Sequence, residues 1–288
     1  MDHLFRSLMF VPAHNDRLMN SAARVNADVL LLDIEDSVQP ASNKQVARDN
    51  ILRYIADGTF RGRVLYPRVN DRESGELLRD VYQLTVEGIT GFMYPKSKKG
   101  EDIYFFGKLL ETIEYEKGFP IGTFKIIPLI ETTGAVMNIQ EICNACPNRV
   151  TAVTDLGGKH DPEGQSIFTA RAQIAMGAKA CGVVPIDTVH IHVHDLEDLE
   201  HNLVLSKKLG FEGMLVLNPK ELPLCHRYYS PGEDEVAWAE EMLALAEEAE
   251  REGKGVALKD NKFIGPPMVK MAQTILSKHR MIQAKCKM

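Results

Sequence analysis

The 288-residue sequence contains no run of 18 or more consecutive apolar residues, which a membrane-spanning helix requires. Its first segment has too short an apolar stretch for a secretory signal, and no small-residue cleavage site follows it. Basic residues are not in excess, because the formal net charge is −6 at pH 7 and no basic stripe is present. We therefore expect a cytoplasmic protein that binds neither membranes nor nucleic acids.

Cysteine is also scarce. The five cysteines are thinly spread and odd in number, which is typical of a protein from a reducing compartment. Cys143 and Cys146 form a C-x-x-C motif, which can serve redox chemistry or zinc binding. No second pair follows at zinc-finger spacing, so packing of a helix face is the favoured interpretation. A glycine-rich phosphate-binding motif after an expected strand is absent as well, which argues against a nucleotide-binding fold.

Short apolar runs are what the sequence does contain, and most of them are followed by a helix-like segment. The runs are continuous rather than alternating, which is typical of parallel strands that are covered on both faces. Eight strand–helix units in about 220 residues predict a (β/α)₈ TIM barrel, with a doubly wound open sheet as the alternative. The eight runs span residues 6–12, 27–36, 62–70, 91–96, 124–132, 149–157, 181–189 and 213–219.

The character of the sequence changes after the eighth run. We expect residues 1–229 to form the barrel and residues 230–288 to form a C-terminal helical extension. Ser230 is expected to cap the first helix of this extension, with Pro231 at its first position and Glu233 completing a capping box. Since the barrel closes without the extension, we expect the extension to cover the barrel mouth or a neighbouring subunit.

Charged and polar residues stand at the ends of the apolar runs, where a TIM barrel has its active site. So many acids in one place would raise each other's pKa unless a cation lay among them. Because the expected ligands are oxygen atoms, this cation is more consistent with Mg²⁺ than with zinc. The remaining acids would then hydrogen-bond the metal's water molecules. These polar residues are Asn15, Asp33, Glu35, Asp36, Arg68, Asn70, Lys96, Glu131, Asp155, Asp187 and Asn218.

Two cations in this set, Arg68 and Lys96, point to an anionic substrate, and the planar fork of Arg68 suits a carboxylate. A metal ion, a carboxylate clamp and nearby acids together suit enolate chemistry on a 2-oxo acid. An alternative is that some of the acids, Asp36 and Asp187 in particular, are structural ion-pair partners.

Several stretches resemble, in the same order, the citrate lyase beta-subunit and malyl-CoA lyase family of the HpcH/HpaI aldolase and citrate lyase superfamily. They are RSLMFVPAHNDRLMNSA, ADVLLLDIEDSV, YPRVN, MYPKSKKGED, IIPLIETTGAV, GFEGMLVLNPKEL and KFIGPPMVKMAQTIL. The resemblance implies a magnesium-dependent barrel, usually an oligomer and often a trimer, whose C-terminal segment reaches over a neighbour's site. It also implies cleavage of short hydroxyacyl-CoA thioesters to acetyl-CoA and a 2-oxo acid.

By this resemblance, Glu131 matches the metal-binding Glu of the family and Arg68 its substrate-binding Arg, while Glu35 and Asp36 match positions near the metal's water shell. The polar residues at the ends of the apolar runs and the family resemblance together indicate one set of site residues. We expect catalytic roles for Arg68, Glu35 and Asp36, substrate binding by Arg68, Lys96 and Asn15, and Mg²⁺ binding by Glu131 and Asp155. Citryl-CoA, malyl-CoA and citramalyl-CoA are the candidate substrates.

The sequence departs from the family pattern in two places. The segment around TDLGGKHD is shorter than usual, so Asp155 is either a replacement for the second metal ligand or a later Asp of the pattern. Gly265 stands where many relatives have an Asp used as acid/base, and a glycine cannot transfer a proton; Asp260 lies nearby. A metal-dependent aldolase acting without CoA and a barrel with only a binding or scaffold role therefore remain alternatives.

Overall fold

The computed structural model describes residues 3–155, 167–251, 257–259 and 262–286. The chain separates into two compact units. One comprises Phe5–His226, and the other comprises Met1–Leu4 together with Arg227–Met288. Asp155 is described only in its backbone, and Asp260 lies outside the described residues. No described helix is both long enough and apolar enough to cross a membrane.

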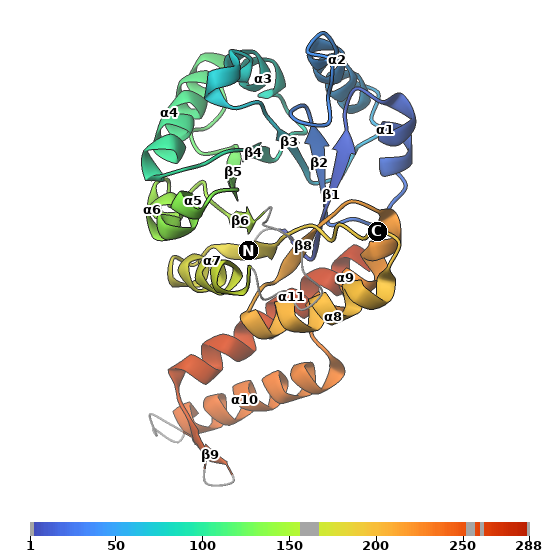
Figure 1. Cartoon of the computed structure of the whole chain (residues 1–288). Coiled ribbons are helices and arrows are strands. Elements are labelled where there is room, and N and C mark those ends of the chain that lie inside the picture. Colours follow the sequence, from blue (N-terminus) through green and yellow to red (C-terminus); the bar gives the residue numbers. More distant parts are fainter. Residues whose placement is uncertain (1–2, 156–166, 252–256, 260–261, 287–288) are drawn as a thin grey trace. The chain divides into compact units, whose positions relative to one another are not determined.

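The larger unit is a closed barrel of parallel strands, which Figure 1 shows as a ring enclosed by helices. Strand β8 pairs with β1, as Leu8 lies beside Leu215 in the register, so the sheet has no free edge. The predicted TIM barrel is thus confirmed, and the open-sheet alternative is wrong. The strands are β1 Ser7–Pro12, β2 Val29–Asp33, β3 Leu65–Arg68, β4 Gly91–Tyr94, β5 Lys125–Ile130, β6 Ala152–Asp155, β7 Val184–Asp187 and β8 Gly213–Val216.

Apart from polar residues near their ends, the strands are apolar because both faces are covered. In β2, for example, the neighbouring residues Leu30 and Leu31 are both fully buried although their side chains point to opposite faces. The outer face packs against the surrounding helices. These helices are α1 Asp16–Ala22, α2 Asn43–Ala56, α3 Leu77–Leu84, α4 Gly100–Lys117, α5 Thr133–Met137, α6 Ile139–Asn144, α7 Phe168–Ala180, α8 Leu196–Leu209 and α9 Leu222–Tyr229.

Apolar side chains fill the inside of the barrel, with Leu8, Leu31, Ile127 and Leu215 among those in one buried cluster. The packing is tight where the barrel closes: a Cβ atom added at Gly213 would lie 1.6 Å from the backbone oxygen of Phe5. With the interior filled, ligands can reach the barrel only at the ends of its strands.

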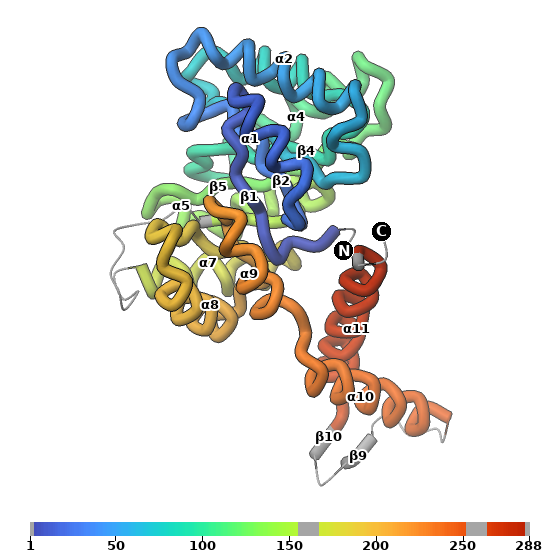
Figure 2. The backbone as a smooth tube through the Cα atoms, turned by 90° about the vertical axis from the view of Figure 1, so that its right-hand side faces the viewer, coloured from blue at the N-terminus to red at the C-terminus, as the bar shows by residue number. Residues whose placement is uncertain are grey.

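The smaller unit is built on two helices, α10 Glu233–Arg251 and α11 Pro266–Cys286, which pack against each other and are seen from a second side in Figure 2. Between them, β9 Ala257–Lys259 and β10 Lys262–Ile264 form an antiparallel pair, which the predicted helical extension did not include. The core of the unit contains Ala239, Met242, Ile264, Ala272 and Leu276.

The predicted cap of α10 is wrong. The helix begins at Glu233, and the Gly232 N–H donates to the Glu235 carboxylate at 3.0 Å, so the capping interaction lies two residues later than expected. The physical reason is that Glu235, and not Glu233, supplies the carboxylate that reaches back to a backbone N–H before the first turn, so the reciprocal contact of the helix start forms at Gly232.

Candidate functional site

A buried ion pair joins the ends of β2 and β3. The strand register places Asp33 beside Arg68, and the Arg68 Nε and Nη2 atoms each donate to one Asp33 oxygen at 2.7 Å. Burial alone would raise the pKa of Asp33, but the hydrogen bonds and the charge of Arg68 outweigh this and hold the pKa below its usual value. The Arg68 guanidinium also lies over the Phe10 ring, 4.8 Å from its centre. Arg68 is therefore rigidly oriented.

The turn after β2 is held by the same aspartate. Asp33 accepts hydrogen bonds from the backbone N–H groups of Glu35 and Ser37, at 3.0 and 3.1 Å. The Lys44 ammonium, which comes from α2, donates to the backbone oxygens of Ile34 and Glu35, both at 3.0 Å. These contacts fix the two acids that follow the strand.

The acids Glu35 and Asp36 differ in exposure. The Glu35 side chain is 4% exposed, and its oxygens lie 2.8 Å from Lys96 Nζ and 3.3 Å from Arg68 Nη1. Burial raises the pKa of Glu35, although Lys96 and Arg68 act against this. The Asp36 side chain is 64% exposed and lies 3.6 Å from Arg68 Nη1. Asp36 is thus the acid of this turn that a ligand can reach most readily.

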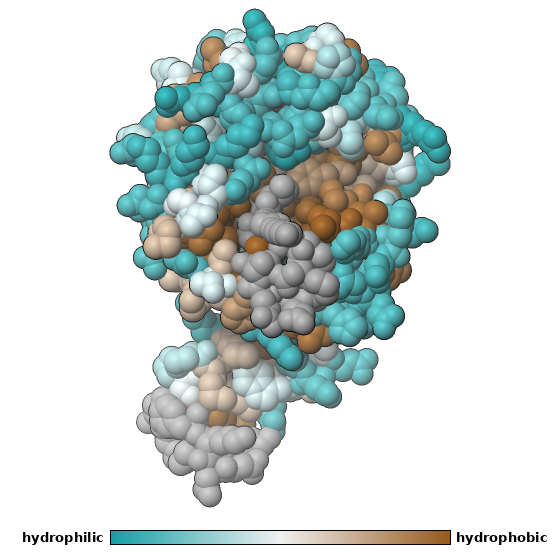
Figure 3. Space-filling view, in the orientation of Figure 1, coloured by the Kyte–Doolittle hydropathy of each residue, from teal (hydrophilic) through white to brown (hydrophobic). Residues whose placement is uncertain are grey.

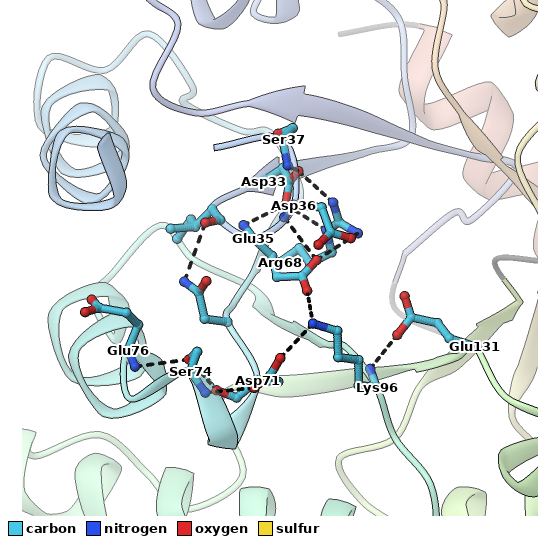
Figure 4. Close-up of polar contacts among 12 residues, drawn as sticks. Asp33, Glu35, Asp36, Ser37, Arg68, Asp71, Ser74, Glu76, Lys96 and Glu131 are labelled. Atoms are coloured by element: carbon cyan, nitrogen blue, oxygen red, sulfur yellow. Dashed lines mark hydrogen bonds and ion pairs between the residues drawn. The ribbon is translucent and has the colours of Figure 1, made fainter. Parts of the chain in front are cut away.

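Glu131 follows β5 directly and accepts a hydrogen bond from the backbone N–H of Lys96 at 2.7 Å, as Figure 4 shows. Its side chain is half-buried, and burial raises its pKa. Asp155 is the last residue of β6, and the register pairs it with Ile130 in the neighbouring strand. The backbones of the two expected metal ligands therefore lie at the same end of adjacent strands.

The structure brings most of the expected site residues together, since Glu35, Asp36, Arg68, Lys96 and Glu131 form one connected group in Figure 4. Asp71 belongs to this group too, because its carboxylate lies 2.7 Å from Lys96 Nζ. Sequence reasoning missed Asp71, although its place directly after the YPRVN stretch is a usable signal.

Two other expected residues have local partners. Asn15 caps α1, and its side-chain oxygen accepts from the Leu18 N–H at 3.2 Å. Its role in substrate binding stays a prediction. Asp187, at the end of β7, is fully buried and paired with Arg171, whose Nε donates to it at 3.0 Å. Asp187 is accordingly a structural ion-pair partner, as one of the sequence alternatives proposed.

The C-x-x-C motif lies apart from this group. Cys143 is buried in α6, and burial raises its pKa to about 12, so its reactive thiolate form is scarce at neutral pH. Cys146 lies with its sulfur 3.6 Å from the backbone oxygen of Ile103. Among the described side chains, no group of three or more His, Cys, Asp or Glu residues is arranged to hold a metal ion.

A cavity of about 470 Å³ opens beside Arg68 and Asp36. Its walls are largely apolar and include Phe10, Leu18, Val189 and Leu217, which come from the ends of β1, β7 and β8 and from α1. Figure 3 shows an apolar hollow in a surface that is otherwise mostly hydrophilic. An apolar cavity with charged groups at one side suits an elongated ligand that has an anionic end.

The loop after β8 borders this cavity and is held by Glu221, which is 1% exposed. One Glu221 oxygen accepts the backbone N–H groups of Leu217 and Asn218, at 3.2 and 3.3 Å. Burial raises the pKa of Glu221 to about 7.

Replacement of Glu221 by glutamine should change how stability depends on pH. The folded chain holds a proton on Glu221 that the unfolded chain releases near its ordinary pKa of 4.5, so stability falls as the pH rises from 4.5 to 7. Between pH 5 and pH 8, the free energy of unfolding of Glu221→Gln should fall by about 1–3 kcal/mol less than that of the wild type, as measured by urea unfolding. The exposed Glu240→Gln variant is the control. An unchanged pH dependence in Glu221→Gln would contradict the prediction.

Comparison with known proteins gives consistent results over most of the chain. The citrate lyase beta subunit of Leuconostoc mesenteroides is 28% identical over 282 residues, covering 96% of this chain and 93% of that protein. Human mitochondrial citramalyl-CoA lyase is 26% identical over 290 residues, covering 94% and 84%. The crystal structure of CitE from Mycobacterium tuberculosis, in complex with magnesium, acetoacetate and coenzyme A, has a TM-score of 0.68 at 23% identity and covers 96% of this chain and 98% of that one.

The HpcH/HpaI aldolase/citrate lyase family matches residues 6–219, which include the whole barrel and every residue of the polar group around Arg68. The barrel fold, the shared region and the relatives agree, and this chain belongs to the HpcH/HpaI aldolase/citrate lyase family.

Proposed function

We propose that this chain is a Mg²⁺-dependent carbon–carbon lyase that cleaves a short hydroxyacyl-CoA thioester to acetyl-CoA and a 2-oxo acid. The observation that carries the proposal is the position of Arg68, a rigidly held guanidinium at the side of an apolar cavity. Asp33 occupies the Nε–Nη2 side of Arg68 and leaves Nη1 beside Asp36, and both Arg68 and Asp36 line the cavity. Arg68 would bind the carboxylate of the 2-oxo portion through Nη1, whose contacts with Glu35 and Asp36, at 3.3 and 3.6 Å, are longer than the 2.7 Å bonds of Arg68 to Asp33.

The metal would be held by Glu131 and Asp155. Oxygen ligands from the ends of adjacent strands suit Mg²⁺, which binds through one or two carboxylates and otherwise keeps water or substrate oxygens. Burial of Glu131 favours its neutral form, so a cation beside it would stabilise the ionised form that binds metal. When bound, Mg²⁺ would polarise the 2-oxo group and stabilise negative charge on its oxygen. Asp36, exposed beside Arg68, would accept the proton of the substrate hydroxyl as the 2-oxo group forms and the carbon–carbon bond breaks. The electron pair of that bond would pass to the thioester enolate, which takes up a proton to give acetyl-CoA.

The named relatives support this chemistry, because they include a citrate lyase beta subunit and a citramalyl-CoA lyase. The related structure with bound magnesium, acetoacetate and coenzyme A supports the metal and a substrate that carries coenzyme A. The apolar walls of the cavity would pack against the acyl group and the arm of coenzyme A. Residues 230–288 would cover the mouth of a neighbouring barrel in a homotrimer, and light scattering would measure the size of that assembly.

The proposal is tested with citryl-CoA, malyl-CoA and citramalyl-CoA, each incubated with the purified protein in the presence of Mg²⁺ or of EDTA. We expect release of a 2-oxo acid from at least one thioester, and only with Mg²⁺. The free acids citrate, malate and citramalate are the matched controls and should give no product. Coenzyme A alone should raise the melting temperature. Absence of product from all three thioesters would overturn the proposal, and cleavage of the free acids would favour an aldolase that does not use CoA.

A further inference from the structure

Lys96 has an unusual backbone conformation at the end of β4. Among the described residues it is the one non-glycine residue with a positive φ, at +52°. The left-handed conformation costs an L-residue with a side chain roughly 1–2 kcal/mol, so the surrounding contacts must hold it. Strain of this kind is concentrated at functional sites. The contacts of Lys96 indicate what the strain achieves here.

Lys96 reaches carboxylates on three different loops. Its backbone N–H donates to Glu131 after β5, while its ammonium lies 2.8 Å from Glu35 after β2 and 2.7 Å from Asp71 after β3. The positive φ allows the backbone N–H and the side-chain ammonium of one residue to contact these three loops at the same time. One residue thereby ties a candidate metal ligand to an acid beside Arg68.

Asp71 is itself anchored. One of its oxygens accepts the backbone N–H of Ser74 at 2.9 Å, which caps the short 3₁₀ turn Arg72–Ser74, and the other oxygen is the partner of Lys96. The Asp71 side chain is 20% exposed, whereas that of Lys96 is 47% exposed. Asp71 is thus the more fixed member of the pair, and it holds the Lys96 ammonium in place.

We infer that Lys96 is a positioning residue, and that Asp71 acts through it to fix Glu35 and Glu131 relative to each other. This differs from the substrate-binding role expected from the sequence, because the ammonium already makes two close contacts with carboxylates of the chain, at 2.8 and 2.7 Å, whereas the contacts of Arg68 Nη1 are longer, at 3.3 and 3.6 Å. The inference rests on the proposed function, because it takes Glu131, which Lys96 links to Glu35, to be a metal ligand.

Because Lys96 and Asp71 carry opposite charges, substitutions of these two residues distinguish a positioning role from a purely electrostatic effect on Mg²⁺ binding. By charge alone, Lys96→Met removes a cation and should strengthen Mg²⁺ binding, whereas Asp71→Asn removes an anion and should weaken it. If the two residues act by positioning, both substitutions weaken binding. A joint role also means that the second substitution adds little once the first has been made.

The test is isothermal titration with MgCl₂, alone and in the presence of oxaloacetate, of the wild type, Lys96→Met, Asp71→Asn and the double variant. We expect each single variant to bind Mg²⁺ about 10-fold more weakly, and the double variant to resemble the singles. With the thioester that the chain cleaves, Lys96→Met should lower kcat and leave KM near the wild-type value. Opposite shifts in Mg²⁺ affinity, additive losses, no loss, or a rise in KM alone would each overturn the inference.

The matched control is the neighbouring pair Lys98 and Glu73, whose charged atoms are 3.8 Å apart and whose side chains are 64% and 86% exposed. Lys98→Met and Glu73→Gln make similar charge changes in the same loops and should leave Mg²⁺ affinity within about 2-fold of the wild type. A wild type that binds no Mg²⁺ would overturn the proposed function and this inference with it. A wild type that binds Mg²⁺, with Lys96 and Asp71 variants that bind equally well, would overturn the inference alone.

Discussion

Arg68→Met should lower lyase activity by about 10²–10³-fold and the free energy of unfolding by about 3–5 kcal/mol. Both effects have the same origin, because Arg68 is the bidentate partner of Asp33, whose side chain is 2% exposed. Without the guanidinium, the Asp33 carboxylate stays buried without its cation, and the substrate carboxylate loses its proposed clamp. Urea unfolding measures the first effect, and release of the 2-oxo acid measures the second.

The double variant Asp33→Asn/Arg68→Met separates the two effects. It removes the uncompensated charge, so part of the stability should return while activity stays low. Arg149→Met is the matched control, because Arg149 makes a similar buried pair with Glu114 next to the N-terminal ends of the strands, away from the barrel mouth. It should lose comparable stability and keep the wild-type kcat. Full activity in folded Arg68→Met would contradict the proposed clamp.

Glu131→Gln should lower Mg²⁺ affinity by more than about 100-fold, whereas Glu35→Gln should lower it about 10-fold. A glutamine at position 131 can still accept the Lys96 N–H through its side-chain oxygen, so the loop should keep its shape while the site loses a negative ligand. Glu35 is held by Lys96 and Arg68, and we expect it to act on the metal's water molecules rather than on the metal. Titration with MgCl₂ measures both affinities.

Thermal unfolding of the two variants provides the necessary control for this comparison. Each variant should remain folded at the temperature of the titration, so that a lost affinity reports on the site alone. Equal losses of affinity in Glu131→Gln and Glu35→Gln would make Glu35 a direct metal ligand.

The barrel could be predicted because its strands are covered on both faces and are therefore continuously apolar. Each strand of the barrel lies inside a predicted run but is shorter than that run. The run 27–36, for example, contains β2, Val29–Asp33. Ile34 is fully buried beyond the end of this strand, and hydropathy therefore does not mark where strand pairing ends. The residues of the site could be predicted as a group because parallel strands bring their C-terminal ends together.

The pairing within the group could not be predicted from spacing. The bond between Asp33 and Arg68 depends on the register of β2 against β3, which the sequence pattern does not specify. The positive φ of Lys96 has no sequence signal, because a lysine gives no indication of left-handed backbone. The place of Asp71 after YPRVN indicates a residue near the site, but the sequence does not show that its carboxylate is the partner of Lys96.

The most direct test of a metal site at Glu131 beside a carboxylate clamp at Arg68 is anomalous diffraction from crystals grown with Mn²⁺ and oxaloacetate. We predict an anomalous peak for a manganese ion that the Glu131 carboxylate coordinates, and a carboxylate of oxaloacetate that accepts a hydrogen bond from Arg68 Nη1. A manganese peak elsewhere on the barrel, or oxaloacetate bound away from Arg68, would contradict this assignment of the site.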